Sequence, residues 1–177
     1  VTRFGFRSAE FTPGGFRHAT KAGFKAQDSQ PMVMGTRAAE LALLVVYESP
    51  LQVICDSPDA YRGQIGTSFL RETPATWDET RVLAGEVGRY IVVARRSGQR
   101  WFVGAITGSE GRTLDIPLDF LGREGLWKAR VVADTPEAWV SPERATEETW
   151  TVRSIGKLTA HMAPGGGLAA ILEPSGP

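Results

Sequence analysis

The stretch GRYIVVARRSGQRWFVGAIT, residues 88–107, decides the fold. The side chains of residues 90–94 and of residues 101–106 alternate with a period of two, which is the repeat of a β-strand. Between the two runs lies Ser97-Gly98-Gln99, a combination that favours a turn. The stretch therefore predicts two short strands joined by a turn.

The same period continues toward the C-terminus. Further strands are expected at residues 114–120, 127–131, 149–153, 158–162 and 168–172, separated by turns rich in glycine, serine and proline. About seven short strands with regular turn signals are typical of an antiparallel sandwich of about 90 residues. We therefore expect a β-sandwich over residues 81–177.

Residues 1–80 lack this period of two, and their pattern predicts loops and helices instead. Thr36 can cap a helix over residues 36–47, and Glu40 lies in its first turns, where the helix dipole favours an anion. This helix is apolar nearly all round, so we expect it to be buried on more than one side. Residues 16–35 have little periodicity and predict a long connecting loop, a feature that often lines a functional site.

A short apolar run, Leu51 to Cys55, follows the helix and predicts a buried strand. Further helical turns can form between Ser57 and Glu72, limited by Pro58 and Pro74. This order of elements, a helix, a short connection, a buried strand and a second helix, is typical of βα units with a parallel sheet. There are too few such units here to close a sheet.

Charge and composition exclude several classes of protein. The 177 residues carry 20 Lys and Arg and 20 Asp and Glu, so the formal net charge is zero, and no basic cluster beyond Arg95-Arg96 suits a nucleic acid. Cys55 is the only cysteine, which excludes a disulfide scaffold. No apolar run approaches the roughly 20 residues that span a bilayer, so we expect no membrane partner. The chain begins at Val1, and we expect it to be processed or a piece of a longer protein.

Two carboxylates are the candidate site residues. Glu10 precedes a loop that contains proline and glycine, and Asp56 follows the predicted buried strand. Ligands bind at the carboxyl ends of strands in α/β sheets, and glycosidases use a pair of carboxylates. Asp56-Ser57-Pro58 is also a natural turn and capping element, so a structural role stays open. An independent enzyme that uses Glu10 and Asp56 is kept as an alternative.

Other reactive side chains have ordinary structural interpretations. His18 and His161 are the only histidines, too few for a zinc site with three or four close ligands. Cys55 ends an apolar run, where a free cysteine behaves as a small hydrophobe. Gly165-Gly166-Gly167 precedes a predicted strand rather than a helix, which indicates a turn and not a phosphate-binding loop.

Five tryptophans raise the possibility of a sugar-stacking face. Trp101, Trp127 and Trp150 alternate with polar residues in predicted strands, so core packing is their expected role. Trp77 lies at the join of the two halves, where packing between them is expected.

Several stretches together, in this order and spacing, resemble the C-terminal part of glycoside hydrolase family 97. They are FTPGGF (11–16), GTRA (35–38), VYESPLQV (46–53), DSP (56–58), PATWDET (74–80), GRYIVVARR (88–96), WFVGAIT (101–107) and APGGG (163–167). The family's members are bacterial α-glucosidases and α-galactosidases with an N-terminal super-sandwich, a catalytic (β/α)8 barrel and a C-terminal β-sandwich. The resemblance implies a mainly β fold with some α. Residues 1–80 would form the closing βα units of the barrel, and residues 81–177 the sandwich, to which oligomerisation is ascribed.

The resemblance also implies what this chain lacks. The family's catalytic carboxylates and calcium-binding glutamates belong upstream of Val1, so no catalytic or metal-ligating residue is assigned here, and calcium is expected only in the full-length enzyme. Glu10 and Asp56 are the expected substrate-binding residues, although the family usually has Asp and Tyr where this chain has Glu10 and Phe11. The implied location is periplasmic or secreted, and the implied partners are an oligosaccharide substrate and further copies of the chain. The alternative is a non-catalytic sandwich module for carbohydrate binding or oligomerisation.

Overall fold

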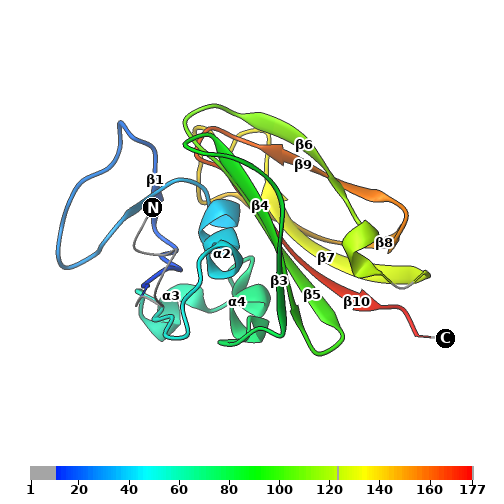
Figure 1. Ribbon diagram of the computed structural model, residues 1–177. Helices are drawn as coiled ribbons and strands as arrows, with labels where there is room; N and C mark the ends of the chain where they lie inside the picture. Colours follow the sequence, from blue (N-terminus) through cyan, green and yellow to red (C-terminus); the bar gives the residue numbers. More distant parts are fainter. Residues whose placement is uncertain (1–10, 123, 177) are drawn as a thin grey trace.

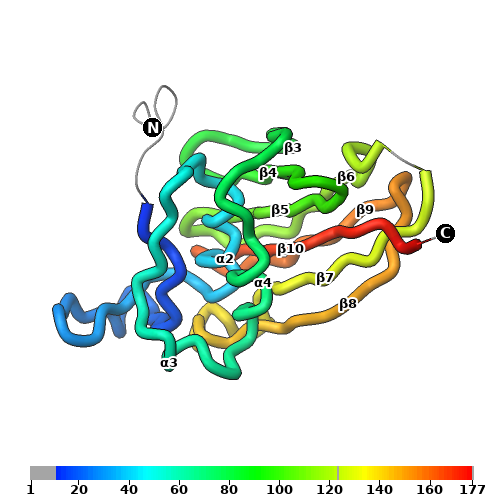
Figure 2. The backbone as a smooth tube through the Cα atoms, turned by 90° about the horizontal axis from the view of Figure 1, so that it is seen from below, coloured from blue at the N-terminus to red at the C-terminus, as the bar shows by residue number. Residues whose placement is uncertain are grey.

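The computed structural model describes residues 11–122 and 124–176. An antiparallel sheet of six strands forms its centre, in the order β3-β4-β5-β10-β7-β8 (Figure 2). These strands are β3 (Glu79–Glu86), β4 (Tyr90–Ser97), β5 (Arg100–Thr107), β10 (Gly167–Pro174), β7 (Leu126–Asp134) and β8 (Ala145–Arg153). β10, the last strand in the chain, lies between β5 and β7 and so ties the two halves of the sheet together.

A second, two-stranded sheet covers one face of the large sheet. It pairs β6 (Arg112–Pro117) with β9 (Lys157–Met162) in antiparallel register. Leu158 and Ile116 of this small sheet pack with Trp101, Val103 and other inward-facing residues of the large sheet in one buried cluster. The prediction of a mainly β fold with antiparallel strands is therefore confirmed, and the two sheets pack against one another (Figure 1).

Helix α2 (Arg37–Val46) covers the other face of the large sheet (Figure 1). Thr36 caps it, as predicted, by accepting a hydrogen bond from the Ala39 backbone N–H. Its Leu41 and Val45 are fully buried in a second cluster with Phe102 of β5. The prediction that this helix is buried on several sides is confirmed.

Among the described residues, four shorter elements lie in the same half of the chain as α2, and Tyr61 and Phe69 of two of them belong to this cluster. They are β1 (His18–Ala19), β2 (Val33–Met34), α3 (Pro58–Tyr61) and α4 (Thr67–Glu72). Phe69 of α4 is buried, and the ring of Trp77 lies edge-on to that of Phe102, with 5.2 Å between the ring centroids. The expected packing role of Trp77 at the join is therefore confirmed.

The prediction of a buried strand at Leu51–Cys55 is wrong. Leu51, Val53 and Ile54 are 57%, 43% and 43% exposed, and the only pairing found for this run is one parallel bridge between Phe11 and Gln52 in the described chain. The run is apolar enough for a buried strand, but within residues 11–122 and 124–176 no sheet covers it.

One further strand prediction needs correction, and one strand was not predicted. The predicted strand at 114–120 ends at Pro117, and a short 3-10 helix, η1 (Asp119–Leu121), follows it. β3 was missed because most of its side chains are exposed and its register shifts between Val82 and Ala84, which removes the alternation.

Candidate functional site

Asp56 lies in the loop before α3, where its carboxylate holds the backbone of a distant segment. Its Oδ2 accepts a hydrogen bond of 2.7 Å from the Phe16 N–H. Its own N–H donates to the hydroxyl of Tyr61, at 2.8 Å. The ring of Tyr61 in turn packs edge-on against that of Phe16, with centroids 4.9 Å apart. Asp56 is therefore an anchor for the chain around Phe16. The other predicted substrate-binding residue, Glu10, lies outside the described residues.

A second carboxylate, Glu40 of α2, holds the same segment. Its Oε1 accepts a hydrogen bond of 2.9 Å from the Gly14 N–H. Burial raises the pKa of Glu40, and hydrogen bonds from the N–H groups of Gly14 and Gly15 oppose that rise. The sequence marked Glu40 only as a helix-dipole residue, because nothing in the pattern places Gly14 beside it.

Arg37 completes this arrangement. Its Nη2 donates to the Phe16 carbonyl oxygen at 3.0 Å, its Nη1 donates to Gln64 at 2.9 Å, and its guanidinium lies 4.3 Å above the Phe16 ring. Three charged side chains, Asp56, Glu40 and Arg37, therefore fix residues 14–16. Both carboxylates are occupied by backbone N–H groups, which suits positioning of the loop rather than proton transfer.

Three further residues considered from the sequence are His18, Cys55 and Gly165. His18 Nδ1 donates a hydrogen bond to the Gly35 carbonyl oxygen, at 3.2 Å. Burial, and then the charge of Arg37, lowers the pKa of His18 to about 4. Burial, and then the charges of Asp56 and Glu40, raise the pKa of the Cys55 thiol, so the thiolate is disfavoured. Gly165, with φ of +68°, lies in the turn before β10.

A metal-binding cluster is not found in the described part of the chain. Among residues 11–122 and 124–176, no group of three His, Cys, Asp or Glu side chains is placed to hold a metal ion. The search of the same residues finds no helix with the length and apolar character to span a membrane.

The tryptophans of the sandwich do not form the sugar-stacking face considered from the sequence. Trp101 and Trp127 are 3% and 4% exposed, so both rings belong to the core, as expected. Trp150 is half-buried against the same cluster, and its Nε1 donates to Glu148 at 2.8 Å. A ligand cannot reach Trp101 without opening the sandwich.

The comparisons with known proteins decide the family. The family described as "Glycosyl-hydrolase 97 C-terminal, oligomerisation" matches residues 76–173, more than half of the chain. The chain belongs to this family. The resemblance inferred from the sequence motifs is thereby confirmed, and the matched residues coincide with β3 to β10.

Two curated relatives extend the likeness toward the N-terminus. The retaining alpha-galactosidase of Bacteroides thetaiotaomicron is 40% identical over 161 residues, covering 90% of this chain and 24% of the relative. The probable retaining alpha-galactosidase of Streptomyces bingchenggensis is 37% identical over 171 residues, covering 96% of this chain and 24% of the relative. The chain therefore spans about a quarter of the length of these relatives.

Solved structures of glycosidases are also similar to this chain. A glycoside hydrolase family 97 enzyme from Pseudoalteromonas sp. strain K8, solved in complex with acarbose, is 34% identical with a TM-score of 0.74, covering 80% of this chain and 23% of that one. A beta-arabinopyranosidase is 25% identical with a TM-score of 0.65, covering 81% of this chain and 22% of that one.

Proposed function

We propose that residues 1–177 form the C-terminal part of a bacterial α-glycosidase and are catalytically inactive alone. The observation that carries the proposal is the family membership together with the 40% identity to a retaining alpha-galactosidase. Because both curated relatives are named α-galactosidases, an α-galactoside with retention of configuration is the favoured reaction of the whole enzyme, and α-glucosides are the second choice.

The first part of the chain would supply the closing βα units of a (β/α)8 barrel. Two parallel pairings support this: His18–Ala19 of β1 pairs with Val33–Met34 of β2, and Phe11 pairs with Gln52. Parallel pairs usually belong to sheets covered on both faces. The exposed apolar side chains of Leu51, Val53 and Ile54 would then be covered by the rest of the barrel.

The polar side chains in the first part of the chain suit the positioning of the loop at residues 14–16. Asp56 and Glu40 both accept hydrogen bonds from the loop at 14–16, and Arg37 holds the Phe16 carbonyl. If this loop borders the substrate in the whole enzyme, Asp56 acts on the sugar chiefly by fixing the loop, and Glu10 remains the proposed direct contact. Calcium would be bound by residues outside this chain, and the enzyme would be periplasmic or secreted.

The sandwich would assemble the enzyme into a homo-oligomer, as the description of its family suggests. A dimer with twofold symmetry is the commonest closed arrangement. The alternative considered from the sequence, a non-catalytic sandwich module, is part of this proposal where its role is oligomerisation.

The proposal is tested by the mass of the purified chain in solution. Sedimentation velocity over a wide range of protein concentrations is expected to show a species heavier than the 19.2 kDa monomer. A monodisperse monomer at every concentration would contradict self-association through the sandwich.

A further inference from the structure

The six-stranded sheet has two edge strands, β3 and β8, and they differ in regularity. β3 pairs with β4 through a register shift between Val82 and Ala84, and a bulge of this kind hinders an edge from pairing with another strand. β8 pairs with β7 without interruption from Ala145 to Arg153. Figure 2 shows β8 along the outer side of the sheet, and no strand of the described chain pairs with its far side. The outward backbone groups of β8 are therefore a regular template for a further strand.

The side chains of β8 leave this edge open. Those that are exposed belong to Glu147, Glu148, Thr149, Thr151 and Arg153. Trp150 and Val152 are half-buried against the core cluster of the sandwich. β8 contains neither lysine nor proline, the residues that most often protect an exposed edge from a second strand.

The charges of β8 select a second copy of the same strand as its partner. In an antiparallel pair formed about a twofold axis, one residue lies opposite itself and the residues on either side of it are exchanged. With Trp150 at the axis, Glu147 of each copy lies opposite Arg153 of the other. Placing Glu147 or Glu148 at the axis would instead put two like charges opposite one another, which is destabilising. The register centred on Trp150 is therefore the one that pairs these charges.

The same register also suits the other side chains of the strand. Thr149 lies opposite Thr151 of the second copy, on the face that Glu147 and Arg153 share, and such threonine pairs are favourable. On the other face the two Trp150 rings lie opposite one another, so each covers surface that is open in the single chain.

Glu147 is fixed in place before a second copy arrives. Its carboxylate accepts hydrogen bonds from the Ser68 hydroxyl, at 2.7 Å, and from the Gly66 N–H, at 3.2 Å. An ionised carboxylate has about four acceptor sites, so sites are left for Arg153 of the second copy. Holding this side chain in the folded monomer reduces the entropy lost on pairing.

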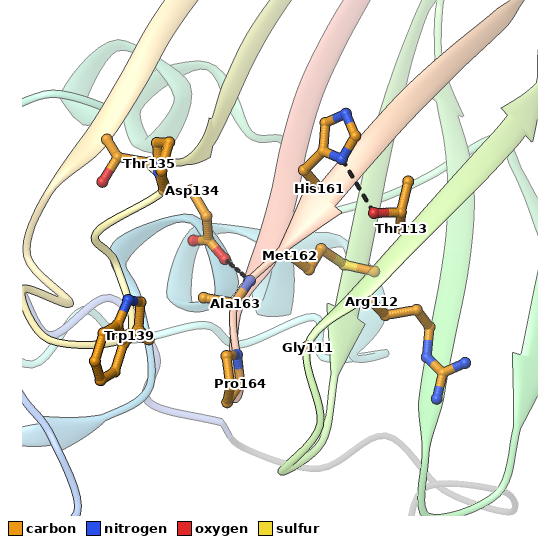
Figure 3. A pocket seen from close by; sticks show the side chains of 11 residues that line it. Gly111, Arg112, Thr113, Asp134, Thr135, Trp139, His161, Met162, Ala163 and Pro164 are labelled. Atoms are coloured by element: carbon orange, nitrogen blue, oxygen red, sulfur yellow. Dashed lines mark hydrogen bonds between the residues drawn. The ribbon is translucent and has the colours of Figure 1, made fainter.

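The end of β7 that lies beside the start of β8 is held in the same way. Asp134, which pairs with Ala145, accepts hydrogen bonds through Oδ2 from the N–H groups of Ala163 and Gly167, at 2.9 and 3.0 Å. Figure 3 shows this carboxylate and its bond to Ala163 beside the hollow at the end of the sandwich. The edge is therefore a pre-formed surface.

We propose that two copies of the chain associate through their β8 strands, antiparallel and centred on Trp150, so that their large sheets join into one continuous sheet. The inference rests on the oligomerisation proposed for the sandwich and goes further by naming the surface and the register. Each β8 is covered in the pair, so assembly through this edge stops at the dimer. A contact of two strands is small, and we expect a dissociation constant in the micromolar range.

The first test is sedimentation velocity of the whole 177-residue chain from about 1 to 300 μM. The wild-type chain is expected to form a dimer. Arg153→Glu places like charges opposite one another at two points, so its dissociation constant is expected to rise at least about tenfold. Arg81→Glu is the matched control, because it makes the same charge change at an exposed residue of the other edge strand, β3. Tryptophan fluorescence checks that both variants are folded.

The second test is disulfide cross-linking, which reports the register. Thr149→Cys and Thr151→Cys are made in a Cys55→Ser chain, so that each variant has one cysteine. Oxidising a mixture of the two is expected to give a covalent dimer, because residues directly opposite have Cβ atoms about 4.5–5.5 Å apart, close to disulfide spacing. Either variant oxidised alone is expected to give much less, because neither position lies opposite itself.

The possible failures are distinguishable. A dimer that Arg153→Glu leaves unchanged, or that Arg81→Glu weakens instead, would refute the β8 interface while the proposed oligomerisation stands. Equal cross-linking of the mixture and of the separate variants would overturn the register centred on Trp150. A folded wild-type chain that is a monomer at every concentration would overturn both the interface and the proposed oligomerisation.

Discussion

Gly104 of β5 lies directly beneath α2, and replacing it with alanine tests how the helix is joined to the sheet. A Cβ atom at this position would lie 2.6 Å from the Ala42 carbonyl oxygen and 3.0 Å from Val45 Cβ. The nearest atom belongs to the helix backbone and cannot rotate away, so α2 or β5 must shift. Overpacking of this kind costs about 1–3 kcal/mol, whereas the loss of glycine freedom in the unfolded chain returns about 0.4–1 kcal/mol.

We therefore expect Gly104→Ala to lower the free energy of unfolding by about 1–2 kcal/mol. The assay is urea unfolding followed by tryptophan fluorescence, in which a slope of about 2 kcal/mol per molar urea converts this loss into a midpoint shift of roughly 0.5–1 M. Gly85→Ala in β3 is the matched control, because its added Cβ would have no neighbour closer than 3.4 Å. Equal midpoints for the two variants would refute close packing of α2 against β5.

Two further variants separate structural from functional roles. Asp56→Ala leaves the Phe16 N–H without its acceptor, so the free energy of unfolding is expected to fall by about 1–3 kcal/mol, while the exposed Asp59→Ala changes it by less than about 0.5 kcal/mol; an unchanged urea midpoint for Asp56→Ala would mean that Asp56 is no anchor. The pKa of His18 is lowered from 6.5 to about 4, so the unfolded chain binds the extra proton between these values and stability falls on acidification. Relative to His18→Gln, the wild-type chain is expected to lose about 3 kcal/mol between about pH 7 and pH 4. His161→Gln is the control, and parallel pH profiles for wild type and His18→Gln would contradict the burial of His18.

The strands and the main helix could be predicted because local signals determine them. Thr36 supplies a cap and the helix that follows is apolar nearly all round, and both features persist in the folded chain. The continuous apolar runs of β4, β5 and β10 indicate more than strands. Strands that are buried on both faces lose strict alternation, and here the second face is covered by α2.

The errors have a common physical origin, which is that burial depends on neighbours distant in sequence. The run at Leu51–Cys55 has the composition of a core strand, but its apolar side chains are exposed in the part of the chain that the structure describes. Glu40 and Arg37 were missed as anchors for the same reason, because only the folded chain brings residues 14–16 beside α2.

Turnover by the purified chain tests the central claim most directly. We propose for residues 1–177 a positioning and assembly role, with the catalytic carboxylates supplied by the rest of the enzyme. Aryl α-galactosides and aryl α-glucosides incubated with the purified chain are therefore predicted to be hydrolysed no faster than in buffer. Hydrolysis that stays with the protein through purification, and that Asp56→Asn abolishes, would contradict the account and make this chain an enzyme in its own right.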